Sequence, residues 1–343
     1  MEPMKVIRPG RTTDLDSLMR LAHSAGPGLT TLPPSEEVLG ARLLESEQAY
    51  AKQVTRPRGE LYMLVMEDLL TAKVVGCSGI LSRVGGFDPF YSYEIRRRVH
   101  ESKALGVRKE VESLHLVANH TGPSEIGSLY LHPDARGGGN GRLLSLSRFL
   151  LMASSPERFA TEVIAEMRGV LDEHQESPFW NAVGRHFFEI DFVTADRRSA
   201  GNKEFIAELM AEHPIYLPLL PKSAQAVVGQ VHPDTEPALR LLQQEGFTFG
   251  GEVDIFDAGP TYRAELARVR TLRDSRVGVF DHIAEPGAGT DRMLVANNVI
   301  DFRATMGAVH VSDEGGVGLP RDVALALGLH LGDTVRYVSA RTT

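Results

Sequence analysis

The sequence predicts an α/β fold with a mixed sheet, in an α+β arrangement, followed by a small β-rich C-terminal part. Three observations support this prediction. Strand-like and helix-like segments alternate along the first part of the chain. A glycine-rich turn joins a strand to a helix there, as in folds whose helices cover a continuous sheet. The last stretch, about residues 268–343, is rich in Val and Gly and contains one small helical segment.

The chain is expected to begin with a short strand at Lys5–Pro9 and then two helices. The first helix is capped by Thr12-Thr13-Asp14 and carries apolar residues at helical spacing. A segment rich in Gly, Pro and Thr, residues 26–34, breaks it. The second helix opens at Ser35 and runs to about Lys52.

A run of strands follows these helices. The apolar runs 61–66 and 74–81 predict a hairpin, and further strands are expected at 113–118 and 126–131. The segment 85–107 is expected to be irregular, and it holds an aromatic cluster of Phe87, Phe90, Tyr91 and Tyr93.

The rest of the first unit is expected to contain a helix at 142–153, a strand at 161–167 and a helix that starts at Ser177-Pro178, where proline suits the first turn. The next unit is expected to contain a strand at 204–210, a helix within 215–228, a helix from Asp234 to Glu245, and strands at 252–257 and 262–267.

We therefore expect three parts: residues 1–200, 201–267 and 268–343. The first two are expected to be tandem units, the second smaller and carrying His232. Gly246-Phe247 after a helix echoes the end of the first unit near Phe187–Phe192, which suggests a partial internal duplication.

The composition argues against several functions. The 343 residues carry a net charge of −8, so a broad nucleic-acid-binding face is not expected. No apolar stretch approaches a membrane span, and Met1–Arg8 lacks the apolar core of a signal peptide. With the single cysteine Cys77, a disulfide within the chain and an all-cysteine metal site are excluded. We expect a cytoplasmic protein.

The sharpest local signal is the turn Arg136-Gly137-Gly138-Gly139-Asn140-Gly141, between a strand and a helix. Glycines let the backbone turn tightly and approach a ligand closely. Their N–H groups and the N-terminus of the following helix favour an anion, and Arg136 and Arg142 add positive charge. These features suit a pyrophosphate.

Three other interpretations of this turn compete. One is a plain surface turn between a strand and a helix. A dinucleotide-binding turn would have Gly or Ala where Leu144 stands and would follow the first strand of its domain. A Walker A loop would end in Gly-Lys-Ser/Thr, whereas Gly141-Arg142-Leu143 stands here.

The turn resembles the acetyl-CoA-binding turn of the Gcn5-related N-acetyltransferase superfamily, Gln/Arg-x-x-Gly-x-Gly/Ala, through Arg136, Gly139 and Gly141. The order of elements is also similar to that superfamily. The resemblance implies that the preceding strand splays from its neighbour, binds the pantetheine arm through its backbone and steadies the thioester oxygen. It implies acyl-CoA contacts at Leu129, Leu131, Arg136, Gly137, Gly139, Asn140, Gly141 and Arg142.

Longer segments resemble arginine N-succinyltransferase. They span about residues 5–262, and the last 75 or so residues carry little of this resemblance. The segments are Gly28–Pro33, Glu166–Gly169, Ser177–Trp180, Phe205–Met210, His213–Tyr216, Gly229–Pro233 and Val253–Pro260.

This resemblance implies transfer of a succinyl group from succinyl-CoA, a co-substrate and not a permanently bound cofactor, to the α-amine of L-arginine in arginine degradation. It implies no nucleic-acid or membrane partner. It also implies a homo-oligomer or an assembly with a related chain, and the intact turn favours a chain that binds acyl-CoA. The resemblance assigns the catalytic proton donor to His232 and a succinyl-CoA contact to Leu129.

Histidine suits this chemistry, because the attacking amine must lose a proton and the departing thiolate can take one up near neutral pH. On the residues alone, a loop histidine before a helix, without a catalytic role, is the better interpretation of His232, and only the resemblance favours the catalytic one. Cys77 stands in an apolar strand and is interpreted as a core residue. No histidines have metal-site spacing, so no metal is expected.

The substrates require further charged groups. A guanidinium needs a carboxylate, and the candidates are Glu125, Glu166, Asp172 and Glu173, although a structural or solvated role explains each of them better. Arg168 is the candidate cation for the succinyl carboxylate. The aromatic cluster either lines the acceptor pocket or packs its own loop.

Three alternatives remain open from the sequence. The enzyme uses another acyl-CoA or amine, for example ornithine, or the chain is a non-catalytic partner of a related chain. The third is a regulatory role of the tail, because Leu319 to Asp333 resembles the swapped-hairpin DNA-binding domains of bacterial transition-state regulators. The acidic balance of the chain argues against this last alternative.

Overall fold

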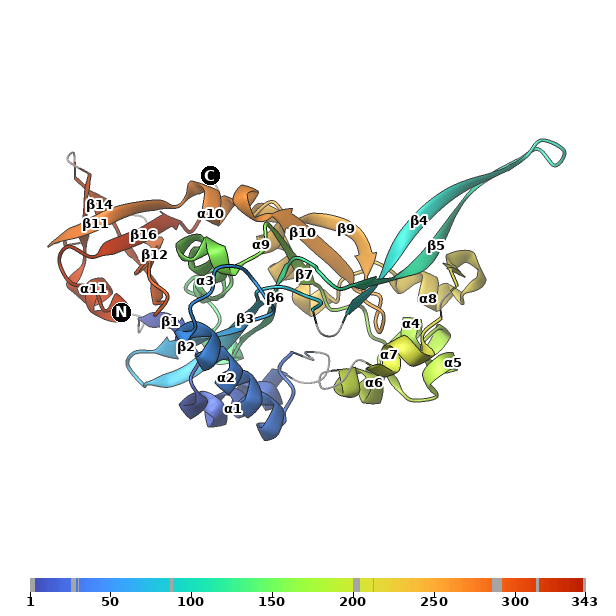
Figure 1. Cartoon of the computed structure of the whole chain (residues 1–343), viewed down its shortest axis with the longest axis horizontal. Coiled ribbons are helices and arrows are strands. Elements are labelled where there is room, and N and C mark those ends of the chain that lie inside the picture. The colour runs from blue at the N-terminus through green and yellow to red at the C-terminus, as the bar shows by residue number, and fades with distance from the viewer. Residues whose placement is uncertain are drawn as a thin grey trace.

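The computed structural model describes residues 4–25, 29, 31–86, 89–199, 204–211, 213–285, 292–312 and 315–341. Within these residues, 16 strands form one mixed sheet in the order β14-β15-β11-β16-β12-β13-β1-β2-β3-β6-β7-β10-β9-β4-β5-β8 (Figure 1). The strands are β1 (Lys5–Pro9), β2 (Leu61–Asp68), β3 (Lys73–Leu81), β4 (Phe90–Ser102), β5 (Val107–Asn119), β6 (Ser124–Leu131), β7 (Glu162–Glu166), β8 (Ile215–Tyr216), β9 (Thr248–Val253), β10 (Pro260–Glu265), β11 (Arg276–Ile283), β12 (Arg292–Ala296), β13 (Ala304–Ala308), β14 (His310–Val311), β15 (Gly316–Leu319) and β16 (Thr334–Ser339). The helices are α1 (Leu15–Ala25), α2 (Glu36–Ala51), α3 (Asn140–Ser154), α4 (Pro178–Ala182), α5 (Arg185–Phe188), α6 (Phe192–Ser199), α7 (Glu204–Leu209), α8 (Lys222–Val227), α9 (Glu236–Gln244), α10 (Arg270–Asp274) and α11 (Arg321–Leu327).

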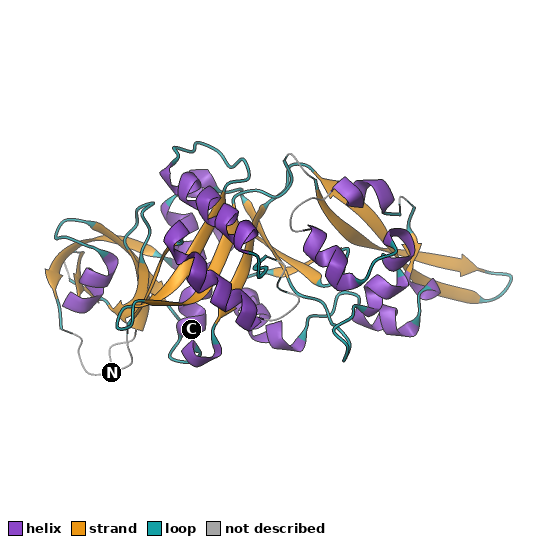
Figure 2. Ribbon diagram, turned by 90° about the horizontal axis from the view of Figure 1, so that it is seen from below, coloured by secondary structure: helices purple, strands orange, loops and turns teal. Residues whose placement is uncertain are grey.

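Helices cover both faces of the central strands. Side chains alternate between the faces of a strand, so one strand serves two cores. On β2, Met63 and Val65 pack in a cluster with α1 and α2, whereas Tyr62, Leu64 and Met66 pack in a cluster with α3. Figure 2 shows helices lying across the strands of the sheet. The predicted α/β fold with a mixed sheet is confirmed.

Strands β6 and β7 lie side by side only where they begin. They are parallel, and their paired residues are Ser124 with Val163 and Glu125 with Ile164. The described parts of both strands form no further pair with each other, although β6 continues to Leu131 along β3. The strands therefore diverge into an opening, as the superfamily resemblance implied.

The sheet continues past β7 into the residues expected to form the second unit. Strand β10 pairs with β7, β9 pairs with β10, and β9 pairs with β4. Helices α4 to α8 bury a separate cluster against this part of the sheet, with Phe179, Trp180 and Tyr93 at its centre. Helix α9 instead packs beside α3, through Leu242.

Three predictions of local structure are wrong. The strand expected at 252–257 lies at 248–253 instead, and residues 254–257 belong to the β9–β10 loop. The segment 85–107 is not irregular, because β4 pairs with β5 along 13 residue pairs in a ribbon that projects from the body (Figure 1). Solvent reaches both faces of its outer part, so the sequence lacks the apolar alternation that marks a half-buried strand. Most of the segment 204–210 forms helix α7 and not a strand; the buried Ile206 lies on α7, and the buried Met210 follows directly after its last residue.

The C-terminal part is β-rich, as predicted, but among its described residues two short helices occur, α10 and α11, where one was expected. Strands β11 to β16 surround a cluster that includes Phe280, Leu319 and Leu327, and β13 joins this part to β1. Helix α11 follows Pro320 and ends at Gly328, whose φ of 66° suits glycine. Among the residues described, no helix is long and apolar enough to cross a membrane.

Candidate active site

The glycine-rich turn lies directly after β6 and opens α3. Gly137, Gly138 and Gly139 have φ values of 103°, 57° and 86°, a left-handed backbone that other residues adopt at a cost. A Cβ atom added at Gly137 or Gly141 would meet none of the described residues within 4 Å. Asn140 stabilises the turn, since its side-chain Nδ2 donates to the carbonyl of Ala135 at 2.9 Å. The Asn140 contact therefore holds the backbone of the turn in place, while the space next to Gly137 and Gly141 is open to a ligand.

The two arginines expected beside this turn lie differently. Arg136 contacts the end of β6, because its Nε donates to the carbonyl of Leu131 at 3.4 Å. Arg142 donates to the carbonyl of Ala340 at 2.8 Å and to Gln244 Oε1 at 3.2 Å. Arg142 thus ties α3 to the C-terminal part, a role that the sequence did not indicate.

Strand β6 bulges where it faces the opening. Cys77 of β3 pairs with Tyr130 but Gly79 pairs with Gly127, so β6 has an extra residue there, and Ser128 has a φ of 50°. Thr31 holds the bulge, because it accepts from the Ser128 N–H at 3.1 Å and from the Ser128 hydroxyl at 3.2 Å. Leu129, just beyond the bulge, packs its side chain against the α3 cluster.

His232 stands beside the chain that leaves β7. Its backbone N–H donates to the carbonyl of Arg168 at 2.8 Å, and Arg168 follows two residues after Glu166, where β7 ends. The His232 side chain is 15% exposed. Its Nδ1 accepts the N–H of Asp234 at 3.2 Å and lies 3.7 Å from an Asp234 carboxylate oxygen. Nε2 is therefore the ring nitrogen left for a ligand.

The surroundings of His232 favour its neutral form. Burial lowers the pKa of His232, the positive charge of Arg168 lowers it further, and Asp234 partly opposes the change. When Nδ1 accepts the Asp234 N–H, the neutral ring carries its proton on Nε2, which is then a donor. When Nδ1 carries the proton and faces the Asp234 carboxylate, Nε2 of the neutral ring is free to accept one.

The same local motif occurs twice, a repeat that is visible in the sequence but was not predicted to be structural. His132-Pro133-Asp134 after β6 and His232-Pro233-Asp234 before α9 both form a 3₁₀ turn capped by the histidine. The first copy continues into the glycine-rich turn and α3. The second continues directly into α9.

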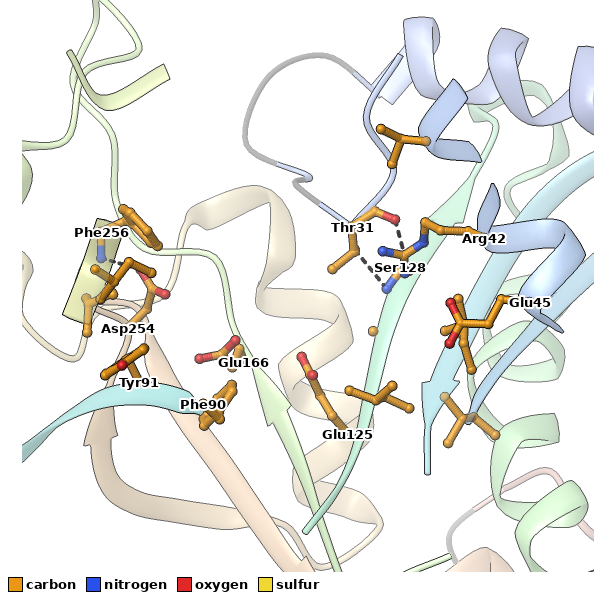
Figure 3. A pocket seen from close by; sticks show the side chains of 18 residues that line it. Thr31, Arg42, Glu45, Phe90, Tyr91, Glu125, Ser128, Glu166, Asp254 and Phe256 are labelled. Atoms are coloured by element: carbon orange, nitrogen blue, oxygen red, sulfur yellow. Dashed lines mark hydrogen bonds between the residues drawn. The ribbon is translucent and has the colours of Figure 1, made fainter. Parts of the chain in front are cut away.

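A cavity of about 350 Å³ lies between α2, β6 and the β9–β10 loop (Figure 3). Arg42 and Glu45 of α2 stand at one end, and Asp254 and Phe256 stand at the other. The described residues that line it are Thr31, Val38, Arg42, Glu45, Leu61, Gly79, Ile80, Leu81, Phe90, Tyr91, Glu125, Gly127, Ser128, Glu166, Ile206, Asp254, Ile255 and Phe256.

Some predicted acceptor residues reach this cavity and others do not. Glu125 and Glu166 point into its middle, with Phe90 and Tyr91 nearby (Figure 3). Asp172 caps its own loop, accepting from the N–H groups of His174 and Glu176. Glu173 is exposed and does not line the cavity.

The aromatic cluster is divided. Phe90 and Tyr91 line the cavity, whereas Tyr93 is buried against Phe179, and Phe87 lies outside the described residues. Cys77 is fully buried, and burial raises the pKa of its thiol to about 12, which fits a core residue. In the part of the chain that is described, no group of three His, Cys, Asp or Glu residues is arranged to hold a metal.

Comparisons with known proteins find the same family along almost the whole chain. A family model described as the arginine N-succinyltransferase beta subunit matches residues 5–271. A second, described as the C-terminal domain of that subunit, matches residues 273–339, so the relationship extends into the tail, where the sequence segments had shown little of it.

Individual relatives give the same result. The chain is 44% identical to an arginine N-succinyltransferase of Yersinia enterocolitica, with 98% of each protein covered. It is also 44% identical to one of Escherichia coli, with 98% of this chain and 97% of the relative covered. The solved structure of arginine/ornithine succinyltransferase subunit AI from Pseudomonas aeruginosa superposes with a TM-score of 0.90 and 36% identity, over 99% of this chain and 100% of that one.

Proposed function

Because the chain belongs to the arginine N-succinyltransferase family, we propose that it transfers the succinyl group of succinyl-CoA to the α-amine of L-arginine, giving N2-succinyl-L-arginine and CoA in arginine degradation. The observation that best supports this proposal is that β6 connects a charged cavity to the glycine-rich turn. Its middle lines a cavity with charges of both signs, and its end leads into an open glycine turn at a helix N-terminus. An acyl-CoA and a cationic amine therefore have adjoining sites.

The acyl-CoA is proposed to follow β6. The N–H groups of Gly137, Gly139 and Gly141, with the N-terminus of the 15-residue helix α3, suit its pyrophosphate. Among the described residues, the edge of β6 that faces the opening has no strand partner beyond Glu125, which leaves backbone groups near Leu129 and Leu131 for the pantetheine arm. A backbone N–H at this edge is suited to hold the thioester oxygen as it becomes negative.

His232 is proposed to move one proton during the reaction. The α-nitrogen of arginine forms a bond to the thioester carbon, and the carbon–sulfur bond then breaks. The amine must lose one proton, and the thiolate must gain one. In the tautomer whose Nδ1–H faces the Asp234 carboxylate, a neutral His232 can accept the first at Nε2. The imidazolium, a stronger acid because its pKa is lowered, can then protonate the thiolate from Nε2.

The three-part division of the chain also remains a proposal. The repeated His-Pro-Asp turn and the packing of α9 beside α3 support two tandem units, of which only the first keeps the glycine turn. We further propose that the protein works as an oligomer, of copies of itself or with a related chain. The descriptions of its relatives as subunits support this.

The substrate assignment is tested by release of CoA thiol from succinyl-CoA and acetyl-CoA, each with L-arginine, L-ornithine and L-lysine. We expect fast release with succinyl-CoA and L-arginine. L-Ornithine is the second candidate acceptor, because the solved relative is named for both amino acids. Faster release with another acyl donor would contradict the succinyl assignment, and no release from protein that binds CoA would indicate a non-catalytic chain.

Replacing Arg168 with Gln is expected to move the His232 limb of the pH profile of kcat/KM to higher pH. The Arg168 charge lowers the pKa of His232, so removing it stabilises the imidazolium. The profile is measured for Arg168→Gln and for Arg185→Gln, in which an exposed arginine on α5 is changed in the same way. A limb that stays in place or moves to lower pH would show that Arg168 does not act on the titrating group.

A further inference from the structure

Arg42 is a cation that lines the cavity and has no role in the proposed proton transfer. It lies on α2, next to the buried Leu43, and its side chain reaches across to β6 (Figure 3). Its Nη2 donates to Ser128 Oγ at a long 3.4 Å. Among the described residues its Nε is buried without a hydrogen-bond partner. The guanidinium thus retains hydrogen-bonding capacity at the wall of the cavity.

The electrostatic surroundings of Arg42 favour an added anion. Burial lowers its pKa, and the negative charges of Glu125 and Glu45 oppose this only in part. A buried cation without a close anionic partner is unfavourable, and a carboxylate that reaches it forms strong, charge-assisted hydrogen bonds.

Arg42 is the charged residue of the cavity that is suited to bind an anion, because the other charged residues described there are carboxylates. Among the described lining residues Arg42 is the one Lys or Arg, and the carboxylates are Glu45, Glu125, Glu166 and Asp254. Those carboxylates suit the cationic groups of an arginine substrate. Arg168, the candidate from the sequence, does not line the cavity, and its Nη2 donates to Gln175 Oε1 at 3.4 Å.

Arg42 lies where the acyl group of a donor bound along β6 is expected to lie. Ser128, its partner, is the bulged residue of β6 where the opening meets the cavity. A thioester held along β6 would place its acyl chain there. Asp254 and Phe256 stand at the far end of the cavity (Figure 3). The succinyl chain and the arginine side chain would then extend in opposite directions from the reacting carbon.

We propose that the guanidinium of Arg42 binds the terminal carboxylate of the succinyl group and makes the enzyme select succinyl-CoA over acyl-CoAs without that carboxylate, an inference that rests on the proposed function. The competing possibility is that Arg42 binds the α-carboxylate of the arginine substrate. A third is that it only supports the bulge at Ser128.

The test compares two donors and two acceptors in Arg42→Gln. The donors are succinyl-CoA and butyryl-CoA, which has a methyl group in place of the carboxylate, and the acceptors are L-arginine and L-argininamide. The variant is expected to lose about 100-fold in kcat/KM for succinyl-CoA, the effect of one charge-assisted contact, and to change little for butyryl-CoA. The preference for arginine over argininamide should stay as in the wild type. Arg20→Gln, an exposed arginine on α1, is the matched control.

Each other outcome overturns the proposal. Equal losses for both donors would indicate a structural role, and a loss that follows the carboxylate of the acceptor would move Arg42 to the arginine site. Binding of succinyl-CoA, butyryl-CoA and free CoA, measured by calorimetry, separates this proposal from the function itself. If the wild-type protein transfers nothing, the proposed function fails. The Arg42 proposal then stands only if Arg42→Gln selectively weakens succinyl-CoA binding, and falls if all three ligands are affected alike.

Discussion

His232→Ala is expected to lower kcat by about 10²- to 10⁴-fold, the usual contribution of a positioned acid–base group. The variant loses the side chain that is proposed to carry the proton from the amine to the thiolate. Its backbone contact with Arg168 does not involve the side chain and is retained. CoA binding, measured by calorimetry, should therefore remain near the wild-type value while turnover falls.

His132→Ala is the matched control for this experiment. It removes the same cap, a histidine Nδ1 that accepts the N–H of the aspartate two residues later, from the first copy of the repeated turn. A similar small loss of thermal stability is expected in both variants, with a large loss of turnover only in His232→Ala. Turnover of His232→Ala within a few-fold of the wild type would remove His232 from the mechanism.

Gly139→Val is expected to weaken CoA binding by about 100-fold or more, the effect of forcing a β-branched residue into a strained backbone conformation. Gly139 has a φ of 86°, and a Cβ there would lie 2.9 Å from the sulfur of Met306. The Met306 side chain can shift away from the Cβ, but the strained backbone at Gly139 is relieved only by moving the start of α3. The N–H groups of the turn would then no longer converge on the pyrophosphate.

A variant at a second glycine distinguishes the general effect of backbone strain from loss of the pyrophosphate site. Gly106 at the tip of the β4–β5 ribbon has a φ of 62° and open space around it, so Gly106→Val introduces backbone strain far from the turn. CoA affinity is expected to survive in Gly106→Val and to fall partly in Gly139→Ala, a milder change. Wild-type CoA affinity in folded Gly139→Val would mean that the turn does not hold the pyrophosphate.

Local features were the most predictable from the sequence. The turn Arg136–Gly141 needs only its flanking strand and helix, and the structure places it between β6 and α3. The ribbon β4–β5 was missed because both faces of its outer part contact water, so its pairing leaves no apolar alternation. Helix α7 was missed because the segment is short and its two buried residues also fit a strand.

The site was less predictable, because distant segments build it. Residues from α2, β6, β7 and the β9–β10 loop line the cavity, and no local pattern shows that they meet. Arg42 left one weak signal, a cation next to the core positions Leu39 and Leu43 of its helix. His232 was singled out only through the family resemblance, and its contact with Arg168 depends on the pairing of strands far apart in the chain.

The central claim is succinyl transfer to the α-amine of arginine, and the structure of the product tests it most directly. The wild-type protein is incubated with succinyl-CoA and L-arginine, and the product is identified by mass spectrometry and NMR. We expect one succinyl group on the α-nitrogen and one free CoA thiol for each arginine consumed. A product succinylated on the guanidinium group, or no succinylated arginine from folded protein that binds CoA, would contradict the account.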